Sequence, residues 1–247
     1  MIETTLDDGW TVPSFTVGEG PPIVLVLGSV EAVRSAAAVA ADAAAGHRVV
    51  AVDAADLASD PAETTIATGR LLALLASLGV RDATLVGHTV GCAVAAHAAR
   101  TAPAGVISRL ALISSPVVLP AASIPSPAAD YATDLGHVTV PTLVLHSETD
   151  PVSPVNDTAL GAAIASPNAQ LRVYPGVREA LSAEQRDAVI RDLLAFAAAA
   201  SPLCTLALPA VRIRPRSDPG RFRPRRPARR RSAFRGRMPP RRRGARG

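Results

Sequence analysis

A hydroxyl side chain between two glycines is the feature of this sequence most able to do chemistry. The stretch LVGHTVGC covers residues 85–92, and Thr89 lies at its centre, between Gly87 and Gly91. An apolar run precedes it and an alanine-rich run follows, so the pattern predicts a strand, a tight turn and a helix. A hydroxyl on such a turn is placed to act as a nucleophile. The Val90 N–H, which opens the helix, is placed to hold an oxyanion.

Nucleophilic chemistry at Thr89 also needs a base. A neutral hydroxyl is a poor nucleophile until a group that titrates near neutral pH takes its proton, and that group is most often an imidazole. The chain has five histidines, at positions 47, 88, 97, 137 and 146, and none follows the last predicted strand. A carboxylate such as Asp150, which does follow a predicted strand, is a much weaker base. We therefore expect no ordinary ester hydrolysis through an acyl-enzyme.

Apolar runs that alternate with helical patterns must position these residues. The sequence predicts a hairpin over residues 4–18 with Asp8-Gly9 as its turn, and a weakly helical segment over 116–137. The predicted buried strands are 21–29, 48–53, 82–88, 109–114, 142–147 and 169–176. The predicted helices are 30–45, 62–78, 90–101 and 182–200. Continuous apolar strands joined by helices indicate an α/β fold, a mostly parallel sheet with helices on both faces. Ligands of such folds bind beyond the carboxyl ends of the strands.

Four segments together resemble the α/β-hydrolase fold superfamily. The segment GHTVG resembles the G-x-S-x-G elbow, and PPIVLVLGS resembles the strand and loop that supply an oxyanion donor. The segment LVLHSETDPVSP resembles the strand before the catalytic acid, and RVYPGVREALSAEQ resembles the segment that carries the catalytic histidine. The resemblance covers about residues 10–198. It implies a triad at Thr89, Asp150 and Glu179, and an oxyanion hole formed by the backbone N–H groups of Ser29 and Val90.

The implied triad departs from the family at two positions, since Thr89 replaces the serine and Glu179 the histidine. Two neighbouring carboxylates share a proton more easily than both ionise, so Asp150 and Glu179 suit general acid/base chemistry. We expect a protein that acts on a small apolar molecule as a lyase, isomerase or cyclase. Two alternatives stay open: a catalytically silent binding or scaffold protein, and a true ester or lactone hydrolase that uses Thr89. Glu179 could also be a surface residue, or a one-residue slip could pair Arg178 with Asp150.

The segment in which the family often carries a cap is short here. Residues 115–140 contain no strong amphipathic pattern, so we expect a minimal cap and an open or shallow site. Leu119, Ile124 and Tyr131 are the candidate apolar lining of that site. An equally open interpretation is that they pin this loop to the core.

The charges divide the chain into two parts. Residues 1–208 hold ten arginines and twenty acidic residues, a formal charge of −10, whereas residues 209–247 hold sixteen arginines and one aspartate, +15. We predict a domain over 1–205 and a disordered Arg/Pro-rich tail over 206–247. The tail has three interpretations: a non-functional extension, a contact with the acidic body, or a site for an anionic partner.

The remaining expectations concern ligands and location. Cys92 and Cys204 form no CxxC motif and no cluster with histidine, which predicts a reduced, cytoplasmic protein without a metal site. We see no phosphate-binding glycine loop, so we expect no cofactor. We also expect a small-molecule ligand, no membrane association and no dedicated nucleic-acid site. The sequence does not indicate an oligomeric state.

Overall fold

The computed structural model describes residues 1–28, 46–58, 63–115, 127–150, 154–156, 158–175 and 183–199. The chain divides into two units, Met1–Leu208 and Pro209–Gly247, and the second lies wholly outside the described residues. The predicted helix over 30–45 and the boundary between 205 and 206 also fall outside them, so both stay predictions.

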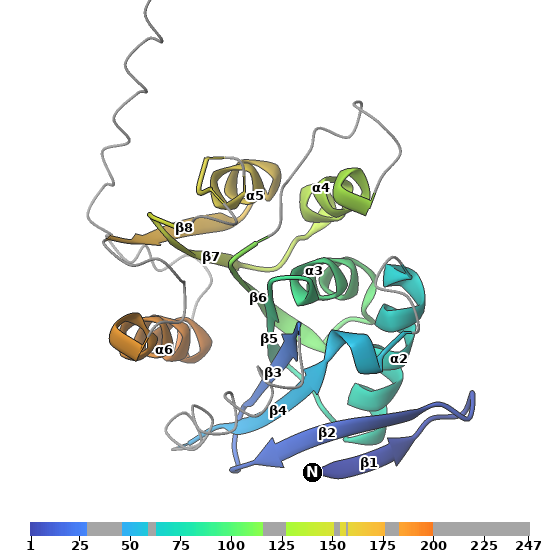
Figure 1. Ribbon diagram of the computed structural model, residues 1–247. Helices are drawn as coiled ribbons and strands as arrows, with labels where there is room; N and C mark the ends of the chain where they lie inside the picture. The colour runs from blue at the N-terminus through green and yellow to red at the C-terminus, as the bar shows by residue number, and fades with distance from the viewer. Residues whose placement is uncertain are drawn as a thin grey trace, which may run out of the picture. The chain divides into compact units, whose positions relative to one another are not determined.

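The described residues form one sheet of eight strands in the order β1-β2-β4-β3-β5-β6-β7-β8 (Figure 1). The strands are β1 (Ile2–Thr5), β2 (Thr11–Val17), β3 (Pro22–Leu27), β4 (Arg48–Asp53), β5 (Ala83–His88), β6 (Ile107–Ile113), β7 (Thr142–Ser147) and β8 (Ala169–Tyr174). β1 pairs antiparallel with β2 and β2 with β4, and every other pairing is parallel. The expected hairpin and mostly parallel sheet are thereby confirmed.

The helices are α2 (Thr64–Ser77), α3 (Gly91–Thr101), α4 (Pro127–His137), α5 (Ala159–Ala165) and α6 (Ala183–Ala198), with a 3-10 turn, η1, at Ala54–Asp56. Two of them correct the sequence analysis. It expected only a weakly helical segment where α4 forms, and no helix where α5 forms. α5 has only seven residues, and α4 follows a proline-rich stretch of sequence, so both give a weak helical signal. Packing against the sheet stabilises them, with Leu135 of α4 and Ala162 of α5 fully buried.

Two apolar cores lie on the two faces of the sheet. Alternate residues of β3 show the division, because Val24 and Val26 belong to the core under α2–α5 whereas Ile23 and Leu25 belong to the core under α6. Figure 1 shows α6 on one side of the sheet and α2, α3, α4 and α5 on the other. A sheet buried on both faces explains why its strands read as unbroken apolar runs. Of the described helices, none is long and apolar enough to cross a bilayer.

The turn between β5 and α3 holds the closest backbone contacts in this architecture. A Cβ placed on Gly91 would lie 2.1 Å from the carbonyl oxygen of Val26, and one on Gly87 would lie 2.6 Å from the Cα of Cys92. Both contacts are far inside van der Waals distance, and both involve backbone that cannot swing away. The glycines at 87 and 91 therefore allow α3 to start directly against β3 and β5.

We predict that Gly91→Ala destabilises the domain by about 2–4 kcal/mol, because the new methyl group must displace the backbone of β3. The control is Gly69→Ala in α2, where a Cβ would meet no atom within 4 Å. That change should instead stabilise the domain by about 0.5–1 kcal/mol, since alanine loses less backbone entropy in a helix. Urea unfolding measures both variants, and equal effects of the two substitutions would contradict the close-packing argument.

Candidate functional site

Thr89 occupies a strained turn at the carboxyl end of β5. Its φ is 51°, in the left-handed region, whereas Val90 after it has φ −63° and begins the helical path of α3. Backbone hydrogen bonds fix the turn on both sides: Thr89 N donates to Ile113 O at 3.1 Å, and Cys92 N donates to Thr89 O at 3.1 Å. A β-branched residue in this region costs on the order of 1–3 kcal/mol. The elbow conformation expected from the sequence is therefore present.

The Thr89 hydroxyl is bound to its own turn. Oγ1 donates to the carbonyl oxygen of His88 at 2.8 Å. It also lies against the end of β3, since a Cβ on Gly28 would come within 2.5 Å of that oxygen. The hydroxyl thus has a backbone acceptor, and only a glycine at position 28 leaves room for it.

The five histidine rings occupy other places, all within the described residues. His97 Nδ1 lies 2.9 Å from Asp134 Oδ2, His137 Nδ1 lies 2.8 Å from Thr133 O, and His146 Nε2 lies 3.4 Å from Thr158 Oγ1. His47 precedes β4, at the end of the sheet opposite Thr89.

His88 is the histidine next to Thr89 in sequence, and burial lowers the pKa of its ring below the ordinary value, so it is neutral at pH 7. Across the described residues, no imidazole nitrogen hydrogen-bonds the Thr89 hydroxyl.

Asp150 lies at the same edge of the sheet as Thr89, two strands away. It follows β7, which is separated from β5 by β6. Neighbouring strands lie about 4.8 Å apart, so the ends of β5 and β7 are about 10 Å apart. β8 ends at Tyr174 at this same edge, because it runs parallel to β7. Glu179 lies outside the described residues, and its place opposite Asp150 stays a prediction.

The structure describes one of the two proposed oxyanion donors. Val90 is the N-cap of α3, and no described residue accepts a hydrogen bond from its N–H. An N–H at a helix start favours negative charge in general, and the role of Val90 as an oxyanion donor stays a prediction. Ser29 lies outside the described residues, so the second donor stays a prediction.

The three candidate lining residues have different outcomes. Leu119 and Ile124 lie outside the described residues. Tyr131 is on α4 with only 2% of its surface exposed, and its hydroxyl pairs with Ser115 Oγ at 2.9 Å. This contact holds α4 against the end of β6, and burial raises the pKa of the Tyr131 hydroxyl well above its usual value. Its role toward a substrate stays a prediction.

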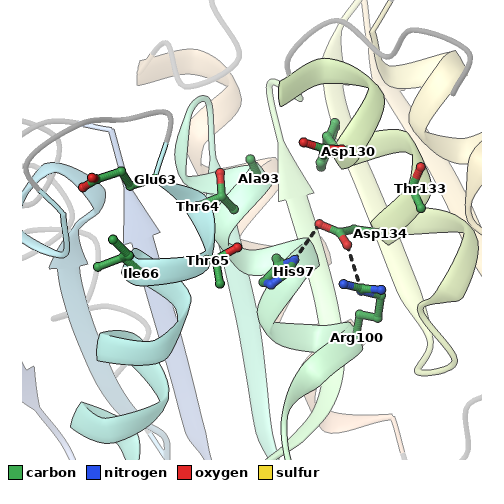
Figure 2. A pocket seen from close by; sticks show the side chains of 11 residues that line it. Glu63, Thr64, Thr65, Ile66, Ala93, His97, Arg100, Asp130, Thr133 and Asp134 are labelled. Carbon is green, nitrogen blue, oxygen red and sulfur yellow. Dashed lines mark hydrogen bonds and ion pairs between the residues drawn. The ribbon is translucent and has the colours of Figure 1, made fainter. Parts of the chain in front are cut away.

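The sequence analysis missed a cluster on the outer side of the helices. Asp134, which is 5% exposed, accepts from His97 Nδ1 at 2.9 Å and from Arg100 Nε at 2.8 Å (Figure 2). The cluster lines a groove of about 520 Å³ formed by residues 63–66 of α2 and its N-cap, by Ala93, His97 and Arg100 of α3, and by residues 130–134 of α4. We call this the helical groove. The spacing of His97 and Arg100 placed both on one face of α3, but only the fold brings Asp134 to them.

Metal binding is not indicated in the described part of the chain. No group of three or more histidine, cysteine, aspartate or glutamate side chains there is arranged to hold a metal ion. Cys92 is a buried free thiol, and burial raises the pKa of its thiol.

Comparison with known proteins gives short sequence matches, and no protein-family model matches this chain. A non-heme chloroperoxidase of Burkholderia pyrrocinia is 42% identical over 67 residues, which is 27% of this chain and 24% of that protein. A non-heme haloperoxidase of Rhodococcus erythropolis is 37% identical over 67 residues, again 24% of its length. The aligned part therefore spans about a quarter of each relative.

Solved structures resemble the chain over most of its length. They include a bromoperoxidase of Bacillus anthracis (TM-score 0.64, 17% identity, 79% of this chain and 99% of that one). An esterase of Rhodococcus sp. has a TM-score of 0.65 at 18% identity, over 81% of this chain and 99% of that one. A meta-cleavage product hydrolase of Pseudomonas fluorescens has a TM-score of 0.65 at 17% identity, over 79% of this chain and 97% of that one. At these identities the likeness concerns the fold.

We predict that Thr89→Gly raises the free energy of unfolding by about 1 kcal/mol, because glycine adopts a φ of 51° without strain. The control is Val90→Gly at the neighbouring position, whose φ of −63° suits any residue. That variant should lose about 1 kcal/mol through the added freedom of the unfolded chain. Urea unfolding compares the two, and a Thr89→Gly variant as unstable as Val90→Gly would show that position 89 is unstrained.

Proposed function

The chain is an α/β-hydrolase-fold protein, and on that premise we propose that it acts on a small apolar molecule without forming an acyl-enzyme. The proposed reaction class is a proton transfer of the lyase, isomerase or cyclase type. One observation carries the proposal: the Thr89 hydroxyl donates to the His88 carbonyl oxygen at 2.8 Å, and every histidine ring lies elsewhere. A hydroxyl without a base does not attack an ester at a useful rate.

The parts that remain support proton transfer. The Val90 N–H at the start of α3 suits a developing oxyanion, such as an enolate oxygen. Asp150, at the same edge of the sheet, is a carboxylate that can accept a proton from carbon and return it. In the proposal Glu179 is the second carboxylate and Ser29 the second oxyanion donor. An isomerisation of this kind moves one proton between two carbons of the substrate and needs no cofactor.

A catalytically silent binding or scaffold protein of the same fold is the second candidate. The closed hydrogen bond within the elbow favours it, because a hydroxyl satisfied by backbone offers nothing to a substrate. The third candidate is a true ester or lactone hydrolase that uses Thr89, and the first of the following tests separates it from the other two.

We expect a panel of p-nitrophenyl esters of increasing chain length to show no turnover above the spontaneous rate. Thr89→Ala is the control, and it should behave as the unaltered chain does. Absorbance of released p-nitrophenolate measures the rate. Ester turnover that disappears in Thr89→Ala would reject the proposal, since it would make the Thr89 hydroxyl a working nucleophile.

We expect the full chain to isomerise small β,γ-unsaturated ketones, with 3-cyclohexenone as the first probe and the conjugated enone as product. Glu179→Gln should lower kcat about a hundredfold, which is typical for loss of a general acid/base group. Glu19→Gln, an exposed glutamate before β3, is the matched control and should keep the full rate. Absorbance of the conjugated product follows the reaction. If none of the unsaturated ketones is isomerised, the silent binding protein is favoured. If Glu179→Gln leaves the isomerisation rate unchanged, Glu179 has no acid/base role.

A further inference from the structure

We propose that the helical groove is a second binding site, and that it takes a small organic cation with a primary ammonium group. The groove lies in the helical layer between α2, α3 and α4, and neither Thr89 nor Asp150 lines it. Tyr131, a candidate lining residue of the strand-edge site, also lines the groove, so Tyr131 is the described residue that the two proposed sites share. Its volume of about 520 Å³ falls in the range of small-molecule sites, about 300–1,000 Å³.

The hydrogen-bonding state of His97 selects a ligand that donates. The Asp134 carboxylate can only accept, so the 2.9 Å contact with His97 Nδ1 places the ring hydrogen on Nδ1. When the ring is neutral, the opposite nitrogen, Nε2, carries a lone pair. No described residue bonds it, and the ring borders the groove (Figure 2). Thr64 and Thr65 add hydroxyl oxygens from the α2 wall. An ammonium group has three N–H donors for these acceptors.

The charges of the groove favour a cation. Arg100 is the one arginine that lines it, and its guanidinium is bound to Asp134 at 2.8 Å. Asp134 is therefore neutralised, whereas Glu63 and Asp130 form no ion pair with any described residue. Glu63 is the N-cap of α2, where its carboxylate offsets the positive end of that helix. Neither carboxylate is paired with a cationic side chain of the described residues, and the sequence of residues 1–208 carries a charge of −10.

The floor and wall of the groove supply apolar contact for the rest of the ligand. Ala93 lies on α3, and Ile66 of α2 is 45% exposed although its side chain is large and apolar. A ring or short alkyl chain attached to the ammonium group would cover this surface. Most of the other residues that line the groove are polar or charged, so this apolar contact is confined to one part of it.

The test is an NMR titration of the ¹⁵N-labelled full chain with three phenyl probes of similar size: benzylamine, benzyl alcohol and benzoate. Benzylamine should shift the amides of the first turn of α2 and of α3 around His97, with saturation at millimolar concentration. Benzyl alcohol should bind several-fold more weakly, and benzoate should leave these amides unmoved. Groove shifts that are as large with benzoate, or none with benzylamine at tens of millimolar, would overturn the proposal.

Variants test whether Asp130 supplies the negative charge and His97 Nε2 the hydrogen-bond acceptor. Asp130→Asn should weaken benzylamine binding about two- to fivefold, as expected for one partly exposed charge. Glu3→Gln removes the same charge from β1, far along the sheet, and should have no effect. His97→Asn keeps a donor for Asp134 but leaves nothing in place of Nε2, and it should weaken binding at least about threefold. Thr89→Ala should bind benzylamine normally. Equal effects of Asp130→Asn and Glu3→Gln would contradict the proposal, because they would show that benzylamine is attracted to the acidic protein in general and not to the groove.

Discussion

The close approach of α3 to the sheet at residues 87–91 is the constraint on which the site depends. A Cβ on Gly91 would lie 2.1 Å from the Val26 carbonyl oxygen, so α3 can begin there only because position 91 has no side chain. The chain must turn from strand to helix within two residues, and the residue between them takes the left-handed conformation at φ 51°. Thr89 is therefore presented above the sheet by packing, whatever chemistry its side chain performs.

The position of Thr89 above the sheet suits a reactive group, but the threonine side chain serves that role only in part. The strain of a β-branched residue at positive φ is usually tolerated where a reactive group must be exposed. Here the exposed group donates to the His88 carbonyl oxygen, and the Val90 N–H beside it has no acceptor among the described residues. Within the described residues, the turn therefore combines an N–H that has no acceptor with a hydroxyl that the backbone satisfies. That imbalance is the physical reason to look for a reaction that stabilises negative charge without a nucleophile.

The helical layer carries its own polar cluster, separate from the elbow. Asp134 is nearly buried and accepts from both His97 and Arg100, so it ties α4 to α3 through two charged contacts. The cluster gives α4 one polar contact with α3, and the Tyr131–Ser115 hydrogen bond gives it another with the residues after β6. A helix with so few large apolar residues depends on such contacts for its place. The same contacts orient His97 toward the groove and leave one ring nitrogen available there.

The sequence by itself determined the succession of strands and helices along the chain and the turn at Thr89. Unbroken apolar runs impose the first locally, and the glycines at 87 and 91 impose the second. It also showed that no histidine follows the last strand, which composition and order suffice to establish. It predicted only weak helical character where α4 forms and no helix where α5 forms, since prolines interrupt the residues before α4 and α5 has only seven residues. The partner of the Thr89 hydroxyl and the meeting of Asp134 with His97 were decided by tertiary structure. The first contact joins neighbouring residues, but it depends on the φ of 51° that packing imposes on Thr89. The second joins side chains that lie 37 residues apart in sequence, which no local pattern encodes.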